Sequence, residues 1–410
     1  MFECDAALEF GALPFRRQND APPYDQHGGP ISSGDGIRRG ASAARDARDA
    51  AREFHAQVDQ PDMSLVLFFC SPEYDLDVLA AELALLFRGV NLVGCTTAGE
   101  ISGLGYGTGT LTGVSFGKNQ FDVATIRLNG LSSIEFATMQ SAPTAAIEQL
   151  QQTGKVVDSR NTFGFLLVDG LCQQEESLVG ALFHGMRDIQ LFGGSAGDGL
   201  NFGQTFIYHE GRFRQDCAIL NLICTERSFV VFKTQHFLPS NEKMVVTEAR
   251  PLCRIVTEIN GEPAAREYAR VVGLEIDELT PMIFASYPVV VKVGGDYYVR
   301  AIQKVNADES LSFFCAIDQG VVFTVARGGD LVKVLEHAFL DVRTQLGEPD
   351  LVLGCDCILR YVEVGQRKVI AEVSRIFADN RVVGFATYGE QFNAMHVNQT
   401  FTAVAIGAAG

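Results

Sequence analysis

Residues 91–100 read NLVGCTTAGE, an apolar run that enters a small-residue turn and closes on Gly99 and Glu100. The pattern returns twice, at residues 189–198 (IQLFGGSAGD) and 381–390 (RVVGFATYGE). Each copy combines apolar residues, a glycine, small or hydroxyl residues and a final Gly-acid pair. The sequence therefore carries three copies of one strand-and-turn signature, and such internal repeats weigh most in the interpretation of a fold.

The repeat is larger than the turn. Each copy predicts an apolar strand, then a helix, then the signature turn, then a second strand. The first strands are predicted at 64–70, 162–168 and 350–354, the helices at 75–88, 175–187 and 366–379, and the last strands at 110–116, 217–223 and 400–406. Strands that alternate with helices are typical of an α/β protein. We expect a globular, pseudo-symmetric sheet; the alternative is a coincidence of common strands and glycine turns.

Composition and charge exclude several classes of protein. The chain has 410 residues and a hydrophobic fraction of 47%, which suits two or three domains. Its net charge of -17 argues against a nucleic-acid partner and disfavours an anionic membrane surface. No apolar run reaches the roughly 18 residues of a transmembrane helix, and the chain starts without the plan of a signal peptide. The ten cysteines form no disulfide framework, which favours a reducing cytoplasm.

The chain also divides along its length. Residues 1–36 are rich in Gly, Pro, Asp and Ser and predict a disordered leader or tag. We expect an N-terminal domain over 37–228, which begins with a helix at 40–57, and a C-terminal domain over 229–410. A β-rich insert is predicted before the third repeat, since hairpin turns occur at 260–261, 294–296 and 318–320.

The repeated acids Glu100, Asp198 and Glu390 have a structural and a chemical interpretation. We favour the structural one, in which each carboxylate accepts hydrogen bonds from backbone amides of its own turn. A hydrolytic pair of acids would need a separation that the sequence does not give. Nucleophilic catalysis by Cys95 or Cys355 would need a nearby base, and no spacing indicates one, so we expect no enzyme.

His236 has the least ordinary setting of the seven histidines. It lies in TQHFLP (234–239) between two predicted strands, with Phe237 beside it and Pro239 stiffening the loop. An imidazole in an apolar pocket built by a loop is what a proximal haem ligand needs. A lone histidine is more often structural, so the residues by themselves leave both interpretations open.

Several motifs together resemble the FIST family of bacterial sensory proteins. They are VGCTTAGE (93–100) with LTGVSF (111–116), FGGSAGD (192–198), VTEINGEPA (256–264), and GFATYGE (384–390) with HVNQT (396–400). The resemblance spans about residues 40–408. It implies an N-terminal and a C-terminal FIST domain, with a role in ligand sensing and signal transduction and no established catalysis.

A narrower resemblance is to the nitric-oxide-sensing haem subgroup of that family, NosP. It rests on LVLFFCSPEYDLD (65–77), QHFLPSNEKMVVTEA (235–249) and LGCDCILR (353–360). Where the wider family has a Gly/Trp-type segment, this chain reads QHFLP (235–239). The resemblance implies a noncovalent haem b, with His236 as the iron ligand and Phe237 and Pro239 in the cofactor pocket.

On this basis we expect a cytoplasmic haem-based nitric oxide sensor that regulates a partner histidine kinase. Neither a nucleic acid nor a membrane is expected as a partner, and a homodimer is left open. The alternative is a haem-free sensor of a small metabolite such as an amino acid. Its site would use the repeated turns and residues 398–400 (NQT). An enzyme that uses Cys95 or Cys355 ranks last.

Overall fold

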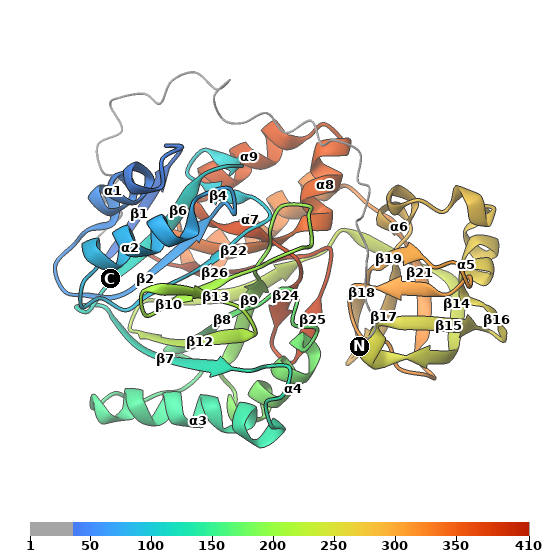
Figure 1. Cartoon of the computed structure of the whole chain (residues 1–410), viewed down its shortest axis with the longest axis horizontal. Helices are drawn as coiled ribbons and strands as arrows, with labels where there is room; N and C mark the ends of the chain where they lie inside the picture. Colours follow the sequence, from blue (N-terminus) through green and yellow to red (C-terminus); the bar gives the residue numbers. More distant parts are fainter. Residues whose placement is uncertain (1–35, 410) are drawn as a thin grey trace.

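The computed structural model describes residues 36–409 as three α/β units and one β-rich lobe (Figure 1). The predicted leader, residues 1–36, lies outside the described residues except for Gly36. In Figure 1 the three units form the body of the molecule, and the lobe, coloured yellow to orange, lies to one side of it. The α/β class, the repeats and the β-rich insert predicted from the sequence are confirmed.

The three units repeat one order of elements. The first contains β1 (Ile37–Ser42), α1 (Ala47–Val58), β2 (Met63–Cys70), α2 (Leu76–Leu86), β3 (Leu92–Thr96), β4 (Glu100–Ser102), β5 (Gly105–Gly107) and β6 (Leu111–Gly117). The second contains β7 (Phe121–Asn129), α3 (Phe136–Gln152), β8 (Thr162–Val168), α4 (Glu175–Gly185), β9 (Gln190–Ser195), β10 (Ile207–His209), β11 (Arg212–Arg214) and β12 (Cys217–Thr225). The third contains β13 (Phe229–Thr234), α7 (Leu331–Leu346), β22 (Leu351–Cys357), α8 (Ile358–Gln366), α9 (Ile370–Asp379), β23 (Val382–Thr387), β24 (Glu390–Phe392), β25 (Met395–Val397) and β26 (Phe401–Ile406).

The lobe is inserted between β13 and α7 of the third unit. It contains β14 (Phe237–Arg250), η2 (Pro251–Cys253), β15 (Ile255–Ile259), β16 (Glu262–Pro263), α5 (Ala264–Val272), η3 (Ile276–Glu278), α6 (Pro281–Ser286), β17 (Val289–Val293), β18 (Asp296–Arg300), β19 (Ile302–Val305), β20 (Leu311–Phe313) and β21 (Val322–Gly328). Its strands form one eight-stranded sheet around their own apolar cluster. The lobe therefore has a core of its own, and residues of β17, β18 and β21 (Val290, Val299 and Ala326) also belong to the apolar cluster of the third unit.

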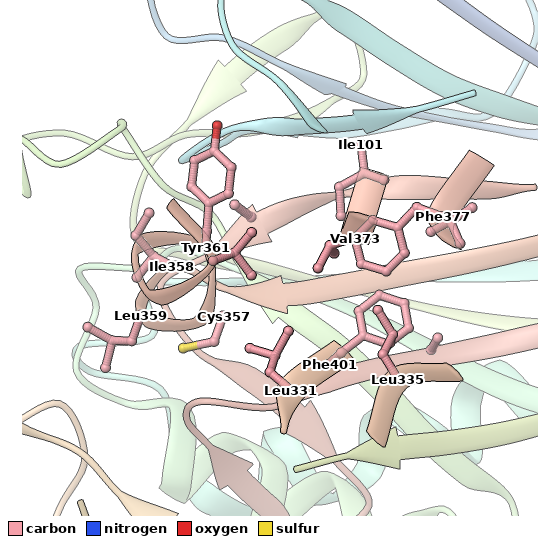
Figure 2. Packing of buried hydrophobic residues seen from close by; sticks show 14 of the residues in the cluster. Ile101, Leu331, Leu335, Cys357, Ile358, Leu359, Tyr361, Val373, Phe377 and Phe401 are labelled. Atoms are coloured by element: carbon pink, nitrogen blue, oxygen red, sulfur yellow. The ribbon is translucent and has the colours of Figure 1, made fainter. Parts of the chain in front are cut away.

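The units exchange hairpins in a cycle. Their six-stranded sheets share one strand order: β1-β6-β2-β3-β10-β11, β7-β12-β8-β9-β24-β25 and β13-β26-β22-β23-β4-β5. The hairpin β10–β11 of the second unit joins the first sheet, β24–β25 of the third joins the second, and β4–β5 of the first joins the third. Figure 2 shows one result, with Ile101 of β4 packed among Val373 and Phe377 of α9. No unit completes its own sheet, so the three form one body.

The glycine of each signature lies where the exchanged hairpin begins. Gly94, Gly193 and Gly384 occupy matching positions, each between the parallel neighbour strand and the incoming hairpin. A Cβ on Gly384 would lie 1.8 Å from the carbonyl oxygen of Gly354, and one on Gly193 would lie 2.0 Å from that of Leu166. Close backbone approach therefore requires glycine at residues 193 and 384, whereas a Cβ on Gly94 would lie 2.5 Å from the ring of Phe68.

Two local predictions were wrong, and one helix was missed. The helix predicted from residue 40 begins at Ala47, because residues 37–42 pair as β1 with β6. The helix predicted over 366–379 is present as α9, whereas α8, which directly follows β22, was not predicted. The segments around residues 318–320 form no hairpin, because β20 pairs with β15 and β19, whereas β21 pairs with β14 and β17.

Among the described helices, none is both long and apolar enough to cross a membrane.

Candidate functional site

The three signature turns meet one another at the centre of the body. Gly197 donates its backbone N–H to Thr96 at 3.0 Å, and Ala98 donates to Ala386 at 2.9 Å. Ser195 donates to Gly389 at 2.9 Å, which links the second and third turns. Each turn is thus hydrogen-bonded to the other two, and the repeat predicted from sequence becomes a three-way junction.

The repeated acids hold their own turns together. Glu100 accepts the N–H and the hydroxyl of Thr110 at 3.1 and 2.7 Å, and Glu390 accepts the same groups of Thr400 at 3.2 and 2.7 Å. Asp198 accepts the backbone N–H groups of residues 203 and 204, both at 2.8 Å. Burial raises the pKa of Glu100 to about 7, although its hydrogen bonds to Thr97 and Thr110 oppose the shift. Each acid thus accepts backbone amides, as the structural interpretation predicts, but these amides lie downstream of the acid and not in its own turn.

A cavity of about 340 Å³ lies between the body and the lobe, next to this junction. Its wall on the body consists of Gly170, Leu171, Gln173, Glu175, Phe202, Tyr388 and His396, and its wall on the lobe of Cys253, Arg254, Ile255, Gln303, Lys304, Asn306, Ser312, Phe313 and Phe314. The size is within the range of small-molecule sites, which favour boundaries between structural units. We call it the junction cavity.

Charged groups of both signs lie along the junction cavity. Arg254 donates to Glu175 and Glu176 at 2.6 and 2.9 Å and to the carbonyl of Phe314 at 2.8 Å. Burial disfavours the charge of Arg254, but the two glutamates outweigh it and raise the pKa of the guanidinium. Its Nε atom is buried without a partner, and Lys304 lines the same wall. The ion pairs tie the lobe to α4 while leaving donor capacity at the cavity.

Aromatic rings from both walls and an imidazole from the body also line the junction cavity. The rings of Phe202 and Tyr388 stack with centroids 4.3 Å apart, and Phe314 lies 6.0 Å from Phe202. His396 is buried, and its Nδ1 has no hydrogen-bond partner within the described chain. Burial lowers the pKa of His396, with Glu176 and Glu175 opposing, so the imidazole is neutral near pH 7. These residues offer ring surfaces for stacking, and the imidazole of His396 can donate or accept a hydrogen bond.

Unpaired polar atoms gather on the hairpin that carries His396. Over the described chain, buried atoms without a partner include Oε1 of Glu390, Oε1 of Gln391, both amide atoms of Asn398 and Oε1 of Gln399. Most buried polar groups in folded proteins are hydrogen-bonded, so such a cluster is expected where a ligand or ordered water completes the bonding. Residues 398–400, which the sequence suggested for a metabolite site, follow this hairpin between β25 and β26, and none of them lines the junction cavity.

The structure brings together two of the three residues predicted for haem. His236 lies between β13 and β14, with its ring 4.1 Å from that of Phe237, and both are buried. Pro239 is exposed in β14, where it pairs with Ala326. None of the three lines the junction cavity.

His236 as placed offers one nitrogen but no open face. Its Nε2 lies 2.9 Å from Oε1 of Glu363, whereas its Nδ1 is buried and has no hydrogen-bond partner among the described residues. Its side chain has no exposed surface, so the present packing leaves no face of the ring open to a porphyrin. Burial lowers the pKa of His236, although Glu363 opposes the shift. Haem binding therefore stays a prediction.

The two candidate nucleophiles lie in the core. Cys95 and Cys355 belong to one apolar cluster and are completely buried. Burial raises the pKa of both thiols well above the ordinary value, which favours the unreactive protonated form. Neither thiol lines the junction cavity.

The sequence did not indicate the lobe side of the cavity. Arg254, Lys304 and Phe314 come from three separate segments of a β-rich insert, and no motif joins them. On the body side a signal was present, since HVNQT (396–400) contains His396 and stood out as part of the resemblance. A ligand site whose residues come from segments far apart in sequence can be recognised only once the fold is known.

Two domains of one family match the chain. The FIST N domain matches residues 64–262, and the FIST C domain matches residues 264–393. Their boundary falls inside the lobe, between β16 and α5, whereas the third unit begins earlier, at β13. The predicted division at residues 228 and 229 stays a prediction. No curated protein matches the chain. The two domains cover most of the described residues, so the chain belongs to the FIST family and has the sensory, small-ligand-binding role in signal transduction of FIST domains.

Proposed function

We propose that this protein senses a small polar metabolite that binds in the junction cavity. The observation that carries the proposal is the cavity itself, which has walls from the body and the lobe and holds partly unpaired polar groups. A ligand in this place contacts both parts at once. It can therefore favour one position of the lobe over another, which is what a sensor requires.

The charges of the cavity suit a zwitterion. Arg254 and Lys304 offer positive charge, Glu175 offers negative charge, and Phe202, Phe314 and Tyr388 offer an apolar surface. An amino acid has both charges and a side chain of variable size. Since the residues provide for all three features, we propose an amino acid or a related zwitterionic metabolite as the ligand.

We further propose a cytoplasmic histidine kinase as the partner that receives the signal. The support is the resemblance to bacterial sensory proteins, together with the net charge of -17, which suits protein contacts better than nucleic acid. A haem-based nitric oxide sensor is the second candidate, and it rests on the resemblance around residues 235–249.

A cavity-filling variant tests the metabolite proposal. A thermal-shift screen of amino acids and related zwitterions identifies a binding compound, and calorimetry then measures its affinity. Leu171→Trp places an indole in the junction cavity and should reduce binding at least about tenfold through steric exclusion. Leu104→Trp is the matched control, because Leu104 lines a separate, smaller pocket.

Equal affinity in wild type and Leu171→Trp would place the ligand elsewhere and contradict the proposal. Absence of any stabilising compound in the screen would count against an amino-acid ligand.

A further inference from the structure

The chain passes between the body and the lobe at two neighbouring points. It enters the lobe between β13 and β14, at His236, and returns between β21 and α7, at Gly329. The two crossings lie side by side, because Gly329 donates its N–H to the carbonyl of His236 at 2.7 Å and Phe237 pairs with Gly328. Two adjacent connections of this kind form a hinge about which an inserted lobe can turn.

One carboxylate holds both crossings to the body. Oε1 of Glu363, on α8, lies 2.9 Å from Nε2 of His236 and 2.6 Å from Nη2 of Arg367. Arg367 then donates through Nη1 to the carbonyl of Gly329 at 2.9 Å. Glu363 thus binds the incoming strand directly and the outgoing strand through Arg367. We call His236, Glu363 and Arg367 the hinge clasp.

The helix that carries the clasp also contacts the central junction. α8 is buried from Ile358 to Gly365. At its start Arg360 binds Asp356 at 2.6 Å, and both side chains are completely buried. Tyr106 of the exchanged hairpin β4–β5 donates to the same Asp356, and its ring lies 4.7 Å from that of Tyr361.

Tyr361 also contacts the first signature turn. Its ring would lie 3.2 Å from a Cβ on Gly99, so it packs directly against that turn. Ile358, Leu359 and Tyr361, labelled on α8 in Figure 2, all belong to one apolar cluster. The packing is therefore continuous along α8, so a displacement of the hinge can be transmitted to the central junction.

We propose that the hinge clasp regulates the junction cavity by fixing the position of the lobe and by transmitting that position to α8. With the clasp formed, the lobe wall stands at a set distance from the body wall. With the clasp broken, the lobe turns about residues 236 and 329 and the cavity opens. The role of a ligand in this device rests on the proposed function, whereas the clasp itself can be measured without any ligand.

The proposal gives His236 a role that iron ligation does not explain. Its Nε2 faces a carboxylate that is shared with an arginine, and its backbone carbonyl binds the returning strand. The contact with Glu363 joins the incoming strand to the body, and the carbonyl contact joins the two crossings to each other. His236 is therefore a positioning residue for the lobe.

Hydrogen exchange of one amide reports the opening of the lobe. Ala316, in the lobe, donates its N–H to Glu176 of α4 at 2.8 Å, so this bond breaks when the walls separate. In the full-length protein without ligand, Arg367→Gln and His236→Phe should accelerate exchange of the peptide that covers Ala316 by about tenfold, as expected when a charge-assisted hydrogen bond is lost. Exchange in β22 and β26 should stay unchanged.

Arg375→Gln is the matched control, because Arg375 on α9 makes a comparable pair with Asp379 on the surface, away from the hinge. It should leave exchange at Ala316 unchanged. Arg367 is partly exposed, so its variant should fold even where the buried His236→Phe does not. Unchanged exchange at Ala316 in both clasp variants, or equal acceleration in β22 and β26, would overturn the proposal. Since no ligand is present, such a failure leaves the metabolite proposal standing, and loss of binding in Leu171→Trp alone leaves the clasp standing.

Discussion

Glu100 and Glu390 use the same contacts ten positions along the chain to close two of the three exchanged hairpins. Each accepts the backbone N–H and the hydroxyl of the threonine that immediately precedes the last strand of its unit. The sequence predicted a structural role for both acids, because a Gly-acid pair after a small-residue turn is a local pattern, but it placed the accepted amides in the turn itself. It predicted less well for His236, since the partner of that histidine, Glu363, lies on a helix far along the chain.

Replacing Glu100 should change how stability depends on pH. Burial raises the folded pKa of Glu100 from 4.5 to about 7, so its stabilising contribution is complete below about pH 4.5 and is lost as pH rises to about 7. Glu100→Gln keeps the shape of the side chain but removes the carboxyl group that gains or loses a proton. The variant should therefore gain stability relative to wild type between about pH 5 and about pH 8, on the order of 2 kcal/mol.

Urea unfolding at the two pH values measures this difference. Glu148→Gln is the control, because Glu148 is exposed on α3 and should leave the pH dependence of wild type intact. A Glu100→Gln variant with the same pH dependence as wild type would contradict the assignment.

At the scale of elements, the repeat could be predicted from the sequence, but the exchange of hairpins could not. Apolar runs, glycines and helical spacing gave the strands and helices of each unit, since these signals are local. The partner of each hairpin is fixed by packing between units, and nothing within β4–β5 indicates that it joins β23 rather than β3. The cavity escaped prediction for the same reason, because its walls come from distant segments.

The signature glycine should not tolerate alanine. In Gly384→Ala the new Cβ would lie 1.8 Å from the carbonyl oxygen of Gly354, where only backbone movement can make room. We expect a loss of about 3 kcal/mol or more in the free energy of unfolding. Gly180→Ala is the control: it lies inside α4 with no atom within 4 Å of the added Cβ and should stabilise the protein by about 0.5–1 kcal/mol. Denaturant unfolding that shows equal effects would disprove the close-approach argument.

At the scale of the whole molecule, the body is closed and the lobe is attached. Cyclic exchange of hairpins joins the three units, whereas the lobe has its own core and two adjacent connections to the body. The lobe contacts the body through the ion pairs of Arg254 with Glu175 and Glu176 and the ring contact of Phe202 with Phe314. Val290 and Val299 of the lobe also pack in the apolar cluster of the third unit. The body is held in one arrangement, whereas the lobe can change its position relative to the body. Such an arrangement is suited to sensing.

An absorption spectrum separates the two sensor candidates. The protein is expressed with haem supplementation and recorded as purified, reduced and with nitric oxide, for wild type and His236→Ala. Because the side chain of His236 has no exposed surface, the account predicts no Soret band that depends on His236. A Soret band that shifts with nitric oxide and disappears in the variant would favour the haem-based sensor.

The central claim is that a ligand bridges the lobe and the body in the junction cavity, and hydrogen exchange with and without a binding zwitterion tests it most directly. The account predicts simultaneous protection of both walls, in the peptides over residues 253–255 and 312–316 of the lobe and over residues 170–176 and 388–396 of the body. Protection confined to one wall, or located away from the cavity, would contradict it.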